Sequence, residues 1–165
     1  MIDKANLIRE IDASTEQLTA TITAVDDNLF DKTSGPGWSP AEIAEHILVL
    51  ETKVNYGLLH AHPTERPVDG KLAAIKQGLA SFEKKYDAPD FVKPTGSIKD
   101  KAALIEGIRK QRSLLKQHVT SLDLSESCEM RHPVIGAMTR LEWVYFNIYH
   151  AGRHVEQMKS ISNRQ

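Results

Sequence analysis

Three histidines of this chain have the residue type and the spacing of a metal-binding site. His150 and His154 are four positions apart, about one turn of an α-helix, so both imidazoles would project from one face with their Cβ atoms roughly 5–6 Å apart. His46 lies far upstream and could approach the pair from a facing helix. Three protein ligands leave a coordination position open, which is typical of catalytic metal sites rather than closed structural ones.

The first of these histidines is expected on a well-marked helix over residues 39–59. Ser39 is followed by Pro40 and by Glu42, the residue types of an N-cap, a first helical position and a capping-box partner. His46 lies among apolar residues at helical spacing, so its ring should point toward the protein core. These apolar residues are Ile43, Ile47, Leu50 and Val54.

The pair is expected on the last helix, which begins at a second capping box formed by Thr139 and Glu142. No carboxylate shares the helical face of His150 and His154, so a carboxylate-bridged centre with two metal ions is not expected. The aromatic residues of this helix are interpreted as core rather than as a cofactor site. They are Trp143, Tyr145, Phe146 and Tyr149.

The rest of the chain predicts further helices and no convincing strand. Apolar residues at steps of three and four mark amphipathic helices, and prolines and glycines mark long connections, including residues 123–138. We therefore expect a single all-α domain over residues 1–165, a four-helix bundle with long connections and one extra short helix, with room for a crossover. The further helical segments are residues 4–25, 71–86 and 99–119.

Composition excludes several classes of protein. The formal net charge is −1, so no basic surplus favours nucleic acid. The first residues are charged, no signal segment is visible, and no apolar run is long enough to span a bilayer; a cytoplasmic protein is expected. The single cysteine, Cys128, excludes an internal disulfide and a thiolate-rich zinc site. We interpret it as a core or loop thiol rather than a nucleophile, because no paired base is visible.

The remaining histidines are weaker candidates for a functional site. His132 could line the mouth of a pocket, but turn packing before Pro133 is favoured. His60 and His62 should face solvent or support a helix terminus, and His118 is expected on the surface.

Three other side chains are expected near the histidine cluster. Gln157 could hydrogen-bond to a ligand histidine. Arg153 is interpreted as structural or supporting, with a glutamate such as Glu45 as its suggested partner. Trp38 should pack at the cap of the second helix, with a roof over the pocket as the alternative.

Four motifs of the chain resemble the DinB-like, YfiT-type family of metal-binding four-helix proteins. The resemblance covers essentially the whole sequence and implies that His46, His150 and His154 bind one divalent ion, with nickel or zinc favoured. It also implies a metal-dependent hydrolase, or a thiol S-transferase that uses a low-molecular-weight thiol. The motifs are Trp38-Ser39-Pro40-x-Glu42-Ile43-x-Glu45-His46, His132-Pro133-x-x-Gly136-x-Met138-Thr139, Glu142-Trp143 and His150-x-x-Arg153-His154-x-x-Gln157.

Three hypotheses about function remain open at this point. The first is a metal-dependent enzyme that activates a thiol or water for transfer to, or hydrolysis of, a small molecule. The second is a non-catalytic, metal-containing protein of stress response or small-molecule binding. The third is a structural bundle whose histidines hold no metal. A monomer or a homodimer would fit each of them.

Overall fold

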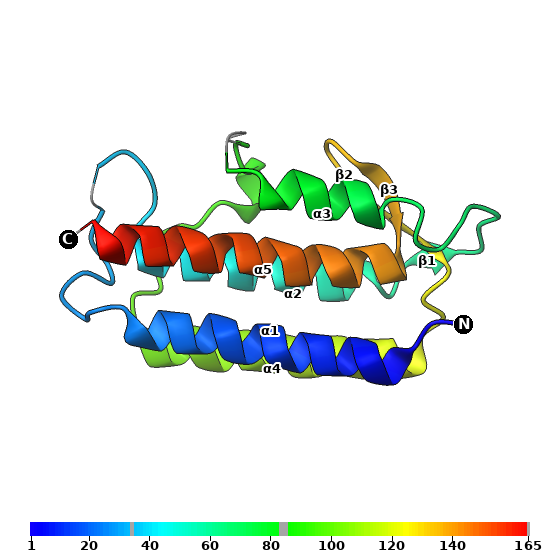
Figure 1. Cartoon of the computed structure of the whole chain (residues 1–165), viewed down its shortest axis with the longest axis horizontal. Helices are drawn as coiled ribbons and strands as arrows, with labels where there is room; N and C mark the ends of the chain where they lie inside the picture. Colours follow the sequence, from blue (N-terminus) through cyan, green and yellow to red (C-terminus); the bar gives the residue numbers. More distant parts are fainter. Residues whose placement is uncertain (34, 83–85, 165) are drawn as a thin grey trace.

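Four long helices lie side by side and form the body of the molecule (Figure 1). The computed structural model describes residues 1–33, 35–82 and 86–164. The predicted all-α class and the four-helix bundle are confirmed. The long helices are α1 (Lys4–Ala24), α2 (Pro40–Gly57), α4 (Lys101–Ser121) and α5 (Arg140–Asn163).

The order of the helices around the bundle departs from a plain up-and-down arrangement. α4 packs against α1 and α2, and α5 packs against α1 and α2, so the sequence neighbours α1 and α2 lie diagonally across the bundle. The long connection before α2 makes this arrangement possible, since it need not bring α2 back beside α1. As a result, the two helices that carry the three histidines are direct neighbours and run antiparallel (Figure 1).

Both predicted capping boxes are present and fix the starts of these two helices. The Ser39 hydroxyl accepts from the backbone N–H of Glu42 at 3.2 Å, and the Glu42 carboxylate accepts from the backbone N–H of Ser39 at 2.8 Å. Thr139 and Glu142 repeat the same exchange at 3.2 and 2.9 Å. Each box satisfies backbone donors that the first helical turn leaves without partners.

The extra short helix is α3 (Leu72–Ala80), which lies along the outside of α5 (Figure 1). It is shorter than the predicted segment 71–86: the chain is extended at Ser81, and residues 83–85 lie outside the described part. Ile75 is its one fully buried side chain, so packing supports only a short helix. A 3-10 turn, η1 (Asp90–Val92), follows before α4.

A small antiparallel sheet, which was not predicted from the sequence, lies beside the helices. Its strands are β1 (Ala61–His62), β2 (Ser127–His132) and β3 (Gly136–Thr139), in the order β1-β2-β3. The expectation of no convincing strand was therefore wrong for residues 123–138. These strands are short, with an irregular register between Ser127 and Arg131, so they lack the sustained alternation that marks a strand in sequence.

The interior consists of two apolar clusters with a polar layer between them. Along α1, α2 and α4 the two clusters are separated by Ser14, Glu51 and Arg112, respectively. Arg112 donates to both carboxylate oxygens of Glu51 at 2.6–2.9 Å and to the Ser14 hydroxyl at 3.1 Å. On α5 the same gap contains Asn147 and His150, so the histidine cluster adjoins the polar layer.

No helix within the described residues combines the length and apolar character needed to cross a membrane.

Candidate metal centre

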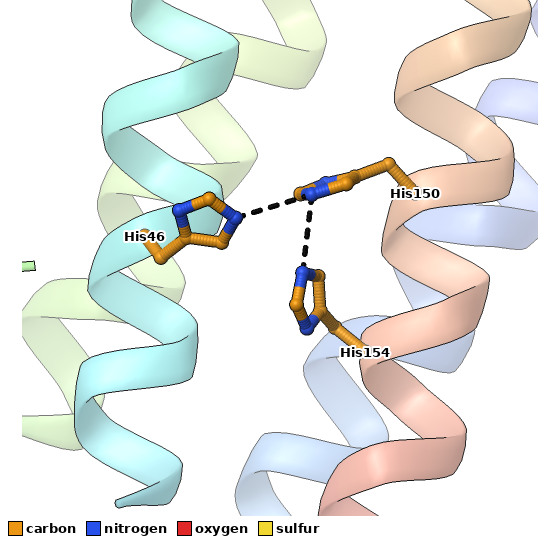
Figure 2. A group of neighbouring side chains, drawn as sticks. All are labelled: His46, His150 and His154. Atoms are coloured by element: carbon orange, nitrogen blue, oxygen red, sulfur yellow. Dashed lines mark hydrogen bonds between the residues drawn. The ribbon is translucent and has the colours of Figure 1, made fainter. Parts of the chain in front are cut away.

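The three predicted ligand histidines converge in the space between α2 and α5 (Figure 2). Nε2 of His150 lies 3.1 Å from Nε2 of His46 and 3.1 Å from Nε2 of His154. Their exposed fractions are only 4%, 8% and 7% for His46, His150 and His154, respectively. Residues separated by about a hundred positions in the chain are thus brought into one buried cluster.

Hydrogen bonds to the opposite ring nitrogens orient two of these imidazoles. Nδ1 of His46 lies 2.7 Å from the backbone oxygen of Val92 in η1, and Nδ1 of His154 lies 2.7 Å from Oε1 of Gln157. Both oxygens are acceptors, so each Nδ1 must carry the proton. In the neutral rings, Nε2 of His46 and of His154 therefore presents a lone pair toward His150.

The surroundings favour the neutral form of all three rings. Burial is the main cause that lowers the pKa of His46, takes the pKa of His150 well below its usual value and lowers the pKa of His154 to about 3. The positive charges of Arg153 and, for His150, of Arg112 act in the same direction. Neutral imidazole is the form that binds metal ions.

The donor set fits a transition-metal ion. One proton on Nε2 of His150 could bond to only one of the two facing lone pairs, so hydrogen bonding within the cluster cannot satisfy both. Nitrogens 3.1 Å apart can both lie at the usual metal–nitrogen distance of about 2.0–2.1 Å from one ion. Imidazole ligands suit zinc, nickel, copper and iron alike.

Aromatic rings enclose the cluster on two sides. The ring of Trp38 lies 4.9 Å from that of His46, and the ring of Phe146 stacks on His150 at 5.5 Å with 17° between the planes. Trp38 also packs against the apolar cluster at the start of α2, in agreement with the favoured interpretation that it supports the helix cap. Phe146 is a core residue, as interpreted from the sequence, and its position four residues before His150 places both on one face of the helix.

A loop held by Glu45 supports His46. The Glu45 carboxylate accepts from the backbone N–H groups of Thr95 and Gly96 and from the hydroxyls of Thr95 and Ser97. These hydrogen bonds outweigh burial and lower the pKa of Glu45. They anchor the segment that carries the Val92 carbonyl.

Arg153 has a structural role, as interpreted from the sequence, but its partners differ from the one suggested. It donates to the backbone oxygens of Leu79 and Ser81 at the end of α3 and lies over the Phe82 ring at 5.1 Å. The suggested pair with Glu45 is replaced by these contacts, because α3 lies against this face of α5.

The remaining histidines lie outside the cluster. Nδ1 of His132 accepts from the backbone N–H groups of Val134 and Ile135 at 3.1 Å, the turn packing that was favoured. His60 and His62 are exposed, as predicted. The surface position expected for His118 was wrong: it is 8% exposed and belongs to the buried face of α4.

Cys128 is a buried thiol of strand β2. Burial raises its pKa to about 11, which keeps the thiol protonated at neutral pH. This agrees with the interpretation as a core thiol.

The fold and the site together define a class: four-helix-bundle proteins with a buried cluster of three histidines between two neighbouring helices. The chain belongs to the DinB superfamily, whose family model matches residues 9–158. The resemblance noted in the sequence is thereby confirmed. A search of curated proteins found no significant match.

Two solved structures share the fold. The structure described as TT2238, a four-helix bundle protein, superimposes with a TM-score of 0.61 at 16% identity, covering 95% of this chain and 98% of that one. YfiT from Bacillus subtilis, described as a probable metal-dependent hydrolase with an unusual four-helix bundle topology, gives a TM-score of 0.64 at 14% identity, covering 99% and 89%. At these identities the likeness concerns the fold.

Proposed function

We propose that the protein is a metal-dependent enzyme that acts on a small molecule, with His46, His150 and His154 as the ligands of one divalent ion. The observation that carries the proposal is the convergence of three buried Nε2 atoms whose lone pairs have no adequate partner among themselves. Nickel or zinc is the ion favoured by the resemblance to DinB-like proteins. The description of YfiT as a probable metal-dependent hydrolase supports the same class of reaction.

A divalent ion bound by three neutral imidazoles would acidify a bound water or thiol and polarise a carbonyl group. Neighbouring residues of this chain would hold the ligand histidines in place for that chemistry. Val92 and Gln157 fix the ring orientation of two ligands. The rings of Trp38 and Phe146 pack against those of His46 and His150, respectively. The reaction we propose is hydrolysis of a small molecule or transfer of a low-molecular-weight thiol to it.

An activity screen tests this proposal. Protein loaded with nickel or zinc would be incubated with simple esters and amides, and with electrophiles together with several cellular thiols. We expect turnover that disappears on metal removal and in His154→Gln, while the exposed-site variant His62→Ala retains it. Metal-bound protein that is inactive across the whole panel would contradict an enzymatic role.

The burial of the three rings favours a second candidate function, a non-catalytic metal-containing protein of stress response or small-molecule binding. With exposed fractions of 4–8%, the cluster is nearly closed to solvent, and a substrate would need a route to it. Stable metal binding combined with the inactive result of the screen would support this candidate. Turnover in the same screen would exclude it.

A further inference from the structure

The carbonyl that orients His46 lies at the start of a connection with little backbone hydrogen bonding of its own. Val92 ends the 3-10 turn η1, and the η1–α4 connection (residues 93–100) then leads to α4. Within the described part of the chain, residues 94–99 form no hydrogen bond from backbone to backbone. Regular secondary structure therefore does not hold this connection in place, and side chains must do so.

Glu45 is the main side chain that holds the connection. Its carboxylate accepts from the backbone N–H groups of Thr95 and Gly96 at 3.2 and 2.8 Å, and from the Thr95 hydroxyl at 2.7 Å. Ile98 adds an apolar contact with the core. Glu45 is 2% exposed and forms no ion pair with any described residue. Its buried charge is therefore stabilised by the donors of the connection.

Two consecutive residues of α2 thus hold the same stretch of chain. Neighbouring side chains on a helix project about 100° apart, so Glu45 and His46 reach different points of it. Glu45 contacts Thr95, whereas Nδ1 of His46 lies 2.7 Å from the Val92 oxygen. Only two residues separate these points. Because the span is so short, the Glu45 contacts keep the Val92 carbonyl at a high effective concentration beside His46.

We propose that Glu45 is a positioning residue of the candidate metal centre: by holding the η1–α4 connection, it keeps the Val92 carbonyl on Nδ1 of His46. This inference rests on the function proposed above and deepens it by naming an element that regulates one of the ligands. Without an acceptor at Nδ1, the neutral ring also adopts the tautomer with its proton on Nε2, which cannot bind an ion. The coupling is reciprocal, so metal binding must also stabilise the connection.

The first test reads the tautomer of His46 in metal-free, full-length protein from the nitrogen-15 NMR shifts of its imidazole. His46→Gln assigns the signal among the seven histidines. Glu45→Gln places an N–H group against the donors of the connection, and Thr95→Val removes a hydroxyl donor from an exposed residue. We expect the ratio of the Nε2–H to the Nδ1–H form to rise at least about threefold in both variants. An unchanged ratio in both would overturn the proposal.

The second test measures nickel affinity by competition with a metal-binding dye. Glu45→Gln should weaken binding about tenfold, the lower end of the range for residues that support a metal ligand, and Thr95→Val about threefold. The control for a loss of stability alone is Glu126→Gln, which removes a carboxylate paired with Arg140 at the start of α5. It should change the affinity less than about twofold. Equal losses in Glu45→Gln and Glu126→Gln would overturn the proposal, because general stability would then explain both.

Hydrogen exchange tests the reverse direction of the coupling. Metal should slow exchange at the backbone N–H groups of Thr95 and Gly96 at least about threefold in the wild type. The N–H of Ser125, which donates to the Asp123 carboxylate in another loop, should be unaffected. Equal slowing at both loops would contradict a specific coupling. Wild-type protein that binds no metal would contradict the function proposed above, whereas the tautomer test needs no metal, so the two proposals fail separately.

Discussion

Oε1 of Gln157 lies 2.7 Å from Nδ1 of His154, one turn earlier on the same helix. This contact assigns the proton to Nδ1 and turns the lone pair of Nε2 toward the cluster. Partners of this kind orient metal ligands and increase their basicity. If His154 binds an ion as proposed, Gln157 would support that binding without direct contact with the ion.

Replacing Gln157 by leucine should weaken metal binding about 10–100-fold, the range typical of lost hydrogen-bond partners of ligand histidines. Gln157→Glu keeps an acceptor oxygen and should retain most of the affinity. The measurement is competition with a metal-binding dye. Gln117→Leu, at an exposed glutamine on α4, is the control. Wild-type affinity in Gln157→Leu would mean that this contact does not support a metal ligand.

The buried ion pair between Glu51 and Arg112 should be important for stability. Both side chains are at most 2% exposed, and removal of one partner from a buried pair leaves an uncompensated charge. We expect Glu51→Gln to lower the free energy of unfolding by about 3–5 kcal/mol. Guanidinium denaturation of metal-free protein followed by circular dichroism measures it.

The control for this prediction is the exposed pair between Lys116 and Asp12, whose side chains are 35% and 54% exposed. Asp12→Asn should cost less than about 1 kcal/mol. Equal effects at the two sites would show that the polar layer is open to water in solution.

Acidification should destabilise the metal-free protein, in part through His118. Burial, assisted by the charge of Arg140, lowers its pKa from the usual 6.5. His118 of the unfolded chain therefore binds a proton near pH 6.5, whereas in the folded protein it binds a proton only at a lower pH. The stability contribution of this residue is complete above that pH and is lost as the pH falls toward the folded-state pKa.

The measurement is the free energy of unfolding between pH 7.5 and pH 5 for the wild type and His118→Gln. The slope should be shallower in the variant. It should not vanish, because burial also lowers the pKa of the three cluster histidines. Identical slopes in the two proteins would show that His118 does not contribute to the pH dependence of stability.

Cys128 should react slowly with thiol reagents in the folded protein. A pKa of about 11 leaves roughly one thiol in a thousand ionised at pH 8, and the thiolate is the reactive form. The rate of iodoacetamide labelling should rise at least about 100-fold in denaturant, as expected when a buried thiol becomes accessible. Rapid labelling of the native protein would instead indicate that strand β2 opens readily.

Local signals in the sequence were sufficient for the helices that carry the site. The capping residues Ser39 and Thr139 marked the starts of α2 and α5, and apolar spacing directed His46 and the His150–His154 pair inward. The His154 contact with Gln157 followed from the same helical geometry, since three residues separate the two.

Features that depend on distant parts of the chain could not be predicted in this way. The Val92 carbonyl is a backbone group, so no side chain marks it as the partner of His46. His118 looked like a surface residue because its burial depends on packing around α4. Strands β2 and β3 were missed because their pairing, rather than a sustained alternation, defines them.

The most direct test of the central claim is metal stoichiometry. Protein prepared without a histidine tag would be titrated with nickel and zinc and its ion content measured by elemental analysis. A shared site predicts one ion per chain, lost separately in His46→Ala, His150→Ala and His154→Ala and retained in His62→Ala, with circular dichroism confirming that each variant is folded. Content near zero after loading, or loss in only one of the three variants, would contradict a shared site.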